Sequence, residues 1–245
     1  MPVFFAPECD LLEERITLRG ANLEHLRVLR VRAGEELRIS DGRGTEARCA
    51  VEQTEKDGCR LRVLERMPAA GEAGVNAVVY AAFPKGDKAE VIVQKAVELG
   101  AASIVFFLSS RCVSRPDEKS AAGKLQRLGK IAEAAAMQSG RGRVPEVRWI
   151  PVFSDMLSEA SEAELSAFFW EDAAGLSLRS LMREKAGFRS AALITGPEGG
   201  FSPEEAQQAS SAGIPVVTLG KRILRCETAP LCALSALMYE SGNLE

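Results

Sequence analysis

A change of sequence rhythm near residue 70 constrains the fold more than any other feature of this 245-residue chain. Before it, short β-forming runs alternate with turn signals; after it, apolar runs alternate with amphipathic helical segments. Residues 67–74, Met-Pro-Ala-Ala-Gly-Glu-Ala-Gly, fit neither pattern and contain small and helix-breaking residues. We therefore predict a first domain at residues 1–68, a linker at 69–74 and a second domain at 75–245.

The first domain is predicted to be a small β-rich unit. Asn22 can cap one helical segment, which offers Arg27 and Arg30 on its polar face. Asp41–Gly42–Arg43–Gly44 is a hairpin-like connection. The β-type runs are residues 3–5, 36–40, 45–53 and 59–64.

The second domain alternates strands with helices, which predicts an α/β fold with a largely parallel sheet covered on both faces. Ligands in such folds bind beyond the carboxyl ends of the strands. The loops that begin at Phe83, Glu171, Thr195 and Leu219 are therefore the places to seek chemistry. Strands are predicted at 77–82, 104–108, 147–152, 167–170, 191–195 and 215–219, and the clearest helices at 87–99 and 230–240.

Composition narrows the classes of function. The formal net charge is −3, so any nucleic-acid contact must come from a local basic patch. The apolar runs are much shorter than the roughly 20 residues that span a bilayer, and the N-terminus lacks the features of a signal peptide, so we expect a cytoplasmic protein. His25 is the single histidine, and the six cysteines form no C-x-x-C pair. We expect reduced, structural cysteines and no metal.

Residues 111–148 are locally basic, with nine Lys and Arg against four Asp and Glu. For Lys119 to Lys130, a solvated helix face explains the basic residues as well as an RNA contact does. Arg141 and Arg143 differ, because they belong to the glycine-spaced polar segment Gln138–Ser139–Gly140–Arg141–Gly142–Arg143. We expect this loop to expose two forked donors suited to phosphates or base edges.

Two loops at strand ends carry the strongest signals. Thr195–Gly196–Pro197–Glu198–Gly199–Gly200–Phe201 lets the main chain approach a ligand closely, and Ser202 with Glu205 predicts a capping box for the next helix. An ordinary strand-to-helix turn is the alternative. The loop lacks the spacing of a dinucleotide-binding motif, and the chain has no Walker loop.

The second loop runs from Leu219 to Ala229. Its apolar pair Ile223–Leu224 can flank an aromatic ring, while Arg225 and Glu227 are available for polar contacts. The alternatives are that Ile223 and Leu224 are core residues and that Arg225 and Glu227 form a salt bridge.

Together these segments resemble the bacterial 16S rRNA (uracil-1498-N3) methyltransferase family of the SPOUT class. The resemblance lies in Phe83–Pro84–Lys85–Gly86–Asp87–Lys88, Gln94–Lys95–Ala96, Glu98–Leu99–Gly100, Gln138 to Arg141, Gly196 to Ser202 and Leu219 to Ala229. Met1 to Phe5, His25 to Arg30 and Asp41 to Gly44 are similar to that family's N-terminal PUA-like barrel. Departures from the family pattern are Cys226, Pro230 and Val97.

The resemblance implies a PUA-like barrel followed by a SPOUT domain with a C-terminal trefoil knot, S-adenosylmethionine as cofactor, 16S rRNA as partner and a homodimer. It implies a cofactor site formed by Glu171, Thr195, Gly196, Glu198, Gly199, Gly200, Leu219, Gly220, Ile223, Leu224, Arg225 and Ala229. Candidate RNA contacts are Arg27, Arg30, Lys85, Lys88, Arg141 and Arg143. The apolar helix face of Leu231, Leu234, Leu237 and Met238 favours dimerisation, with burial inside the subunit as the alternative.

Methyl transfer to uracil N3 requires alignment of sulfur, methyl group and nitrogen, and a weakened N3–H bond. No histidine lies in the second domain, so we expect Arg225 to stabilise the developing uracil anion and Glu198 to orient the cofactor or the base. The competing hypotheses are a non-catalytic RNA-binding dimer, a SPOUT methyltransferase for another RNA position and a nucleotide-dependent oxidoreductase.

Overall fold

The computed structural model describes residues 3–173 and 175–244 and divides into two compact units. The first contains the chain up to Glu72 together with Ala136–Val144, and the second contains Ala73–Ala135 and Pro145–Glu245. Met1 and Pro2, part of the family-like N-terminus, lie outside the described residues. Within the described ranges, no helix has both the length and the apolar character needed to cross a membrane.

The first unit is built on one curled five-stranded sheet with the order β1-β3-β4-β5-β2. Pairing is antiparallel except between β1 and β3. Alternating side chains such as Phe4, Leu37 and Leu61 form its core. The predicted strands are confirmed, and β2, which the sequence reading missed, adds Ile16 and Leu18 to that core. The elements are β1 (Val3–Phe5), β2 (Arg15–Leu18), α1 (Gly20–Val28), β3 (Glu36–Ser40), β4 (Thr45–Thr54) and β5 (Cys59–Pro68).

The helix α1 differs from the prediction at both ends. It begins at Gly20, so Asn22 lies inside it and donates a side-chain hydrogen bond to the carbonyl oxygen of Phe5 (2.7 Å) instead of capping the helix. Arg30 follows the helix with a φ of 53° and is not on a helical face. The competing interaction with β1 explains why the capping prediction was wrong.

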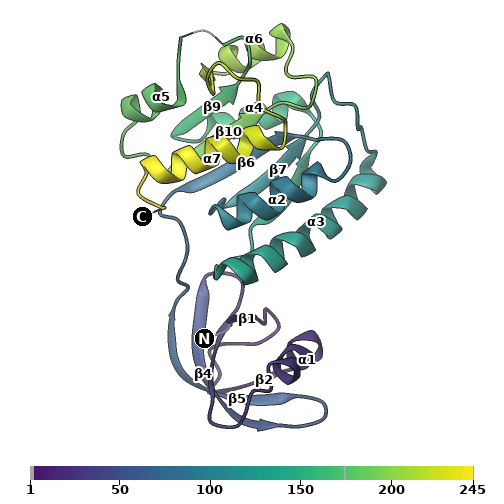
Figure 1. Ribbon diagram of the computed structural model, residues 1–245, viewed down its shortest axis with the longest axis vertical. Helices are drawn as coiled ribbons and strands as arrows, with labels where there is room; N and C mark the ends of the chain where they lie inside the picture. The colour runs from purple at the N-terminus through teal and green to yellow at the C-terminus, as the bar shows by residue number, and fades with distance from the viewer. Residues whose placement is uncertain (1–2, 174, 245) are drawn as a thin grey trace. The chain divides into compact units, whose positions relative to one another are not determined.

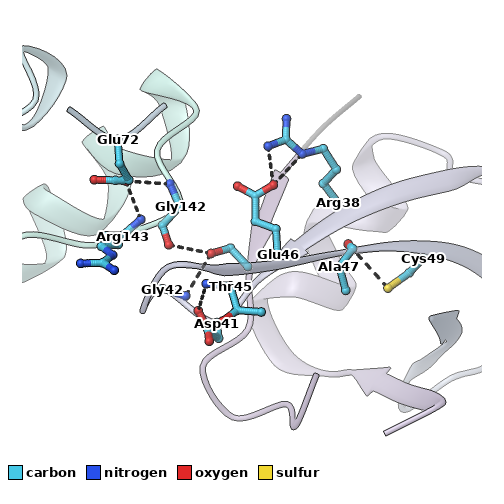
Figure 2. Close-up of polar contacts among 11 residues, drawn as sticks. Arg38, Asp41, Gly42, Thr45, Glu46, Ala47, Cys49, Glu72, Gly142 and Arg143 are labelled. Atoms are coloured by element: carbon cyan, nitrogen blue, oxygen red, sulfur yellow. Dashed lines mark hydrogen bonds and ion pairs between the residues drawn. The ribbon is translucent and has the colours of Figure 1, made fainter. Parts of the chain in front are cut away.

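The predicted linker is anchored where it leaves β5. The Glu72 carboxylate accepts hydrogen bonds from the guanidinium of Arg141 (2.7 Å) and from the amides of Gly142 (3.1 Å) and Arg143 (3.0 Å), as Figure 2 shows for the two amides. The Ser40 hydroxyl donates to the carbonyl oxygen of Gly142 (2.9 Å). Residues 136–144 are therefore part of the first unit, although they lie far from it in the sequence.

The second unit contains a six-stranded sheet in the order β11-β9-β10-β6-β7-β8, and every pairing is parallel. This confirms the predicted sheet. Its strands are β6 (Asn76–Ala82), β7 (Ser103–Phe107), β8 (Glu146–Ile150), β9 (Leu165–Phe169), β10 (Ser190–Thr195) and β11 (Val216–Val217). Figure 1 labels four of these strands, β6, β7, β9 and β10. The remaining helices are α2 (Lys88–Glu98), α3 (Glu118–Ser139), α4 (Phe153–Ser161), α5 (Leu178–Glu184), α6 (Pro203–Ser211) and α7 (Thr228–Glu240).

Helix α7 packs against α2, β6 and β10, while α4 and α6 enclose an apolar cluster on the sheet that includes Phe107, Phe168 and Phe201. Leu234, Leu237 and Met238 are fully buried within the chain. The expectation that Leu234, Leu237 and Met238 form a dimer face is therefore wrong, because the sheet and α2 already cover them. Leu231, the fourth residue of the predicted face, is half-buried.

The chain passes from β10, inside the sheet, to β11 at its edge beyond β9, and then returns to the middle of the sheet as α7. Helix α6 starts with the predicted capping box: the Ser202 hydroxyl accepts from the amide of Glu205 (3.2 Å), and the Glu205 carboxylate accepts from the amide of Ser202 (2.9 Å). The buried ring of Phe201 lies 4.1 Å from that of Phe168, centroid to centroid. The loop between β10 and α6 is thus fixed at its C-terminal end.

Candidate functional site

A pocket lies beyond the carboxyl ends of β9, β10 and β11, where the parallel fold places ligands. It brings together nine of the predicted cofactor residues: Glu171, Thr195, Gly196, Gly200, Leu219, Gly220, Ile223, Leu224 and Ala229. Residues from the segments 169–171, 195–200 and 218–229 thus line one pocket. Predicted residues outside this lining are Glu198, Gly199 and Arg225.

Gly200 provides the close approach that the glycine loop predicts. Its φ of 65° lies in the left-handed region, and a Cβ atom there would overlap the carboxylate of Glu171, which lines the same pocket. Gly199 has no such φ, and a Cβ on it would meet Arg111, 3.1 Å from the Cβ of that residue. Of Gly199 and Gly200, it is therefore Gly200 whose missing side chain keeps this part of the pocket open.

Glu198 lies at a junction of three loops. Its carboxylate accepts hydrogen bonds from the amide of Lys85 (2.9 Å) and from the Nζ of Lys88 (2.9 Å). Partial burial raises the pKa of Glu198, but these hydrogen bonds outweigh it and leave the pKa below its usual value. Glu198 is therefore held as a carboxylate, which makes it a poor proton acceptor at neutral pH.

Lys88 extends this junction to the loop before α7. Its Nζ also lies 3.7 Å from the Glu227 carboxylate and 3.7 Å from the Sγ of Cys226. Burial and a hydrogen bond to Glu227 raise the pKa of Cys226 to about 12, so this pocket-lining thiol stays protonated. The structure thus places Lys88 in a network of ion pairs that joins the two loops flanking the pocket.

Arg225 is exposed, and its backbone is fixed because its carbonyl oxygen accepts from the amides of Thr228 (2.8 Å) and Ala229 (2.9 Å). Over residues 3–173 and 175–244 there is no salt bridge between Arg225 and Glu227, which instead faces Lys88. Ile223 is 87% exposed at the pocket, so it is not a core residue. The loop from Leu219 to Ala229 therefore presents the side chains of Ile223 and Arg225 to solvent.

The candidate RNA contacts differ in exposure, and Lys88 is half-buried in the ion-pair network with Glu198 and Glu227. Arg30, Lys85 and Arg143 are exposed. Arg27 is partly occupied by hydrogen bonds to Glu24 and to the carbonyl oxygen of Lys56, both 2.6 Å. Arg141 is only 4% exposed because its guanidinium binds Glu72, so the expectation that it is an exposed donor is wrong.

Some pocket residues escaped the sequence reading. Trp170 was assigned to a strand end; its indole N–H donates to the carbonyl oxygen of Phe201 (3.3 Å) and so joins β9 to the glycine loop. The lining residues that the sequence analysis missed are Phe169, Trp170, Thr218, Arg222 and Cys226. All of them stand directly before or within the predicted loops, and that position was the signal that could have found them.

Comparison with known proteins identifies the class that this fold and pocket define. The family described as RNA methyltransferase domain matches residues 72–238, and the family described as RNA methyltransferase PUA domain matches residues 18–64. The protein is therefore a SPOUT-class RNA methyltransferase with an N-terminal PUA-like domain.

The relatives define the family more narrowly. A ribosomal RNA small subunit methyltransferase E from Bacillus subtilis is 31% identical over 93% of this chain and 91% of its own length. The structure of the enzyme of that name from Neisseria gonorrhoeae, bound to S-adenosyl methionine, is 34% identical with a TM-score of 0.84 over 98% of both chains. A probable rRNA-methyltransferase from Porphyromonas gingivalis has the same TM-score at 29% identity over 100% of both chains.

The chain belongs to the ribosomal RNA small subunit methyltransferase E family. This confirms the resemblance drawn from the sequence motifs. Membership of this family argues against two of the competing hypotheses, a nucleotide-dependent oxidoreductase and a non-catalytic RNA-binding protein.

Proposed function

We propose that the protein uses S-adenosylmethionine to methylate N3 of one uridine, position 1498 in the family's name, in 16S rRNA of the small ribosomal subunit. The observation that carries this proposal is the pocket at the ends of β9, β10 and β11 in a chain of this family. We place this activity in the cytoplasm, because its proposed substrate is ribosomal RNA.

The pocket supplies groups suited to the cofactor. Leu219, Ile223 and Leu224 offer apolar surface for an adenine ring, and the exposed Glu171 carboxylate suits ribose hydroxyls or an ammonium group. Gly196 and Gly200 bring the main chain close to this space. The bound cofactor would supply an electrophilic methyl group on its sulfonium sulfur.

Arg225 is the residue we assign to the reacting uracil. Its guanidinium has no salt bridge to Glu227 in the described part of the chain, so its donors are available to the carbonyl oxygens that flank N3. Glu198, as an engaged carboxylate, organises the loops and does not take the N3 proton. Charge stabilisation therefore contributes more here than general base catalysis.

Mass spectrometry of rRNA nucleosides tests the proposal. Cells without this gene should lack one 3-methyluridine of 16S rRNA, and the purified protein with S-adenosylmethionine should restore it. Comparing free 16S rRNA with assembled small subunits would identify which of them the enzyme accepts. Methylation at another base or position would instead support the alternative of a SPOUT enzyme with a different target.

Substitution of Lys88 tests the loop junction. Lys88→Met removes the ion pairs that join Glu198 and Glu227, and we expect S-adenosylmethionine affinity to fall about tenfold because a charged hydrogen bond is lost beside the pocket. Lys85→Met is the matched control, since Lys85 uses only its backbone amide in this network. Calorimetry should show a change for Lys88 alone; equal affinities would contradict the positioning role.

We also propose a homodimer, as the family resemblance implies. With Leu234, Leu237 and Met238 buried, we assign the contact between subunits to Ile223 and Tyr239, whose apolar side chains are 87% and 65% exposed. Sedimentation equilibrium at micromolar concentration should give twice the chain mass. A fully active monomer would refute the dimer and any site shared between subunits.

A further inference from the structure

Two exposed arginines lie directly opposite each other in the first unit. Arg43, in the turn between β3 and β4, forms an isolated antiparallel bridge with Arg143. Directly opposed residues of an antiparallel pair project on the same face, with Cβ atoms roughly 5 Å apart. Two permanently charged groups are thus held together, although like charges in this arrangement destabilise the pair.

The carboxylates around this pair bind other groups. Glu72 accepts hydrogen bonds from Arg141 and from two backbone amides, and Asp41 accepts from the amides of Arg43 (2.7 Å) and Thr45 (3.0 Å). In the described ranges, 3–173 and 175–244, neither Arg43 nor Arg143 has a salt bridge. Both guanidinium groups are therefore available to an external anion.

The backbone that carries the two arginines is fixed on both sides. The amide of Val144 donates to the carbonyl oxygen of Gly42 (3.2 Å). The Ser40 hydroxyl accepts from the amide of Gly42 (3.0 Å) and donates to the carbonyl oxygen of Gly142 (2.9 Å). Gly44 has a φ of 108°, and the side chain of Arg143 occupies the space where a Cβ would stand. Such prearrangement lowers the ordering cost of binding.

Acidic side chains beside Arg43 restrict the path that a bound polyanion can follow over the two arginines. A hollow beside Arg43 is lined by Glu8, Asp10 and Asp41. A polyanion that contacts Arg43 is repelled on that side, so its path continues over Arg143. The geometry therefore favours a chain of phosphates crossing the bridge from one arginine to the other.

We propose that Arg43 and Arg143 form a clamp for phosphodiester groups of the substrate RNA. The planar forked donors of arginine match phosphate oxygens. This inference rests on the proposed function, because RNA is the polyanion that an enzyme of this family handles. It also gives residues 136–144 a role: they complete an RNA site that the β3–β4 turn alone does not form.

The test is the double variant Arg43→Ala/Arg143→Ala, assayed for binding to a 16S rRNA transcript at several KCl concentrations. Near 100 mM salt we expect the dissociation constant to rise about tenfold or more, and the slope of log K against log salt to fall by roughly 1 to 2, as two phosphate contacts are lost. S-adenosylmethionine affinity should not change. The double lysine variant, which keeps the charge and loses the fork, should be intermediate.

The matched control is Arg15→Ala/Arg48→Ala, which removes the same charge from the same unit. These arginines are already paired, Arg15 with Glu52 (3.1 Å) and Arg48 with Glu36 (3.0 Å), so the effect should be smaller. Wild-type RNA affinity and salt slope in the clamp variant, or an equal loss in the control, would overturn the inference. A wild-type protein that binds the transcript without methylating it would instead count against the proposed function.

Discussion

Replacing Gly200 with valine should abolish S-adenosylmethionine binding, raising the dissociation constant at least about 100-fold, or roughly 2.7 kcal/mol. The new side chain would displace the Glu171 carboxylate from the pocket wall and fill space next to Gly196. A β-branched residue is also strained at a φ of 65°. Isothermal calorimetry measures the affinity directly.

The variant Gly213→Val is the control that distinguishes the effect of backbone strain from the effect of filling the pocket in Gly200→Val. Gly213 follows α6 with a φ of 77°, and nothing lies within 4 Å of the Cβ position, so valine there strains the backbone without entering the pocket. We expect this control to lose stability and keep the cofactor affinity. A folded Gly200→Val protein with unchanged affinity would show that the cofactor binds elsewhere.

The sheet and the pocket could be predicted because both depend on local signals. Apolar strands that alternate with amphipathic helices form parallel sheets, and the carboxyl ends of parallel strands meet at one edge. Loops starting at Glu171, Thr195 and Leu219 were therefore bound to be neighbours once the strand order placed β9, β10 and β11 together. The glycines and the capping box at Ser202 fixed the shape of one wall.

The pairing of charges could not be predicted, because periodicity carries no information on which distant groups meet. Arg141 and Glu72 are 69 positions apart, and Lys88 and Glu198 are 110 apart. From the sequence, both Arg141 and Lys88 were expected to contact RNA. In the fold, a buried guanidinium requires a carboxylate partner, and Glu72 supplies it from what looked like a linker.

The sequence also did not reveal what packs against the apolar face of α7. A stripe formed by Leu234, Leu237 and Met238 indicates that something covers the helix, but it does not distinguish a partner subunit from the chain's own sheet. Burial against β6, β10 and α2 follows from the return of the chain after β11. That return was implied by the family resemblance and not by any periodicity.

Arg225→Ala should slow methyl transfer about 100-fold, since the loss of one well-placed donor costs about 3 kcal/mol once the bound RNA excludes water from the exposed Arg225 side chain. Arg225→Lys keeps the charge without the planar fork and should fall between alanine and wild type. Lys221→Ala, an exposed cation of the same loop, is the control and should have little effect. Single-turnover assays with saturating RNA and cofactor separate chemistry from binding. A normal rate for Arg225→Ala would make this residue part of the scaffold; because Glu198 is already engaged by Lys88, activation of N3 would then have to come from the backbone or from a partner subunit.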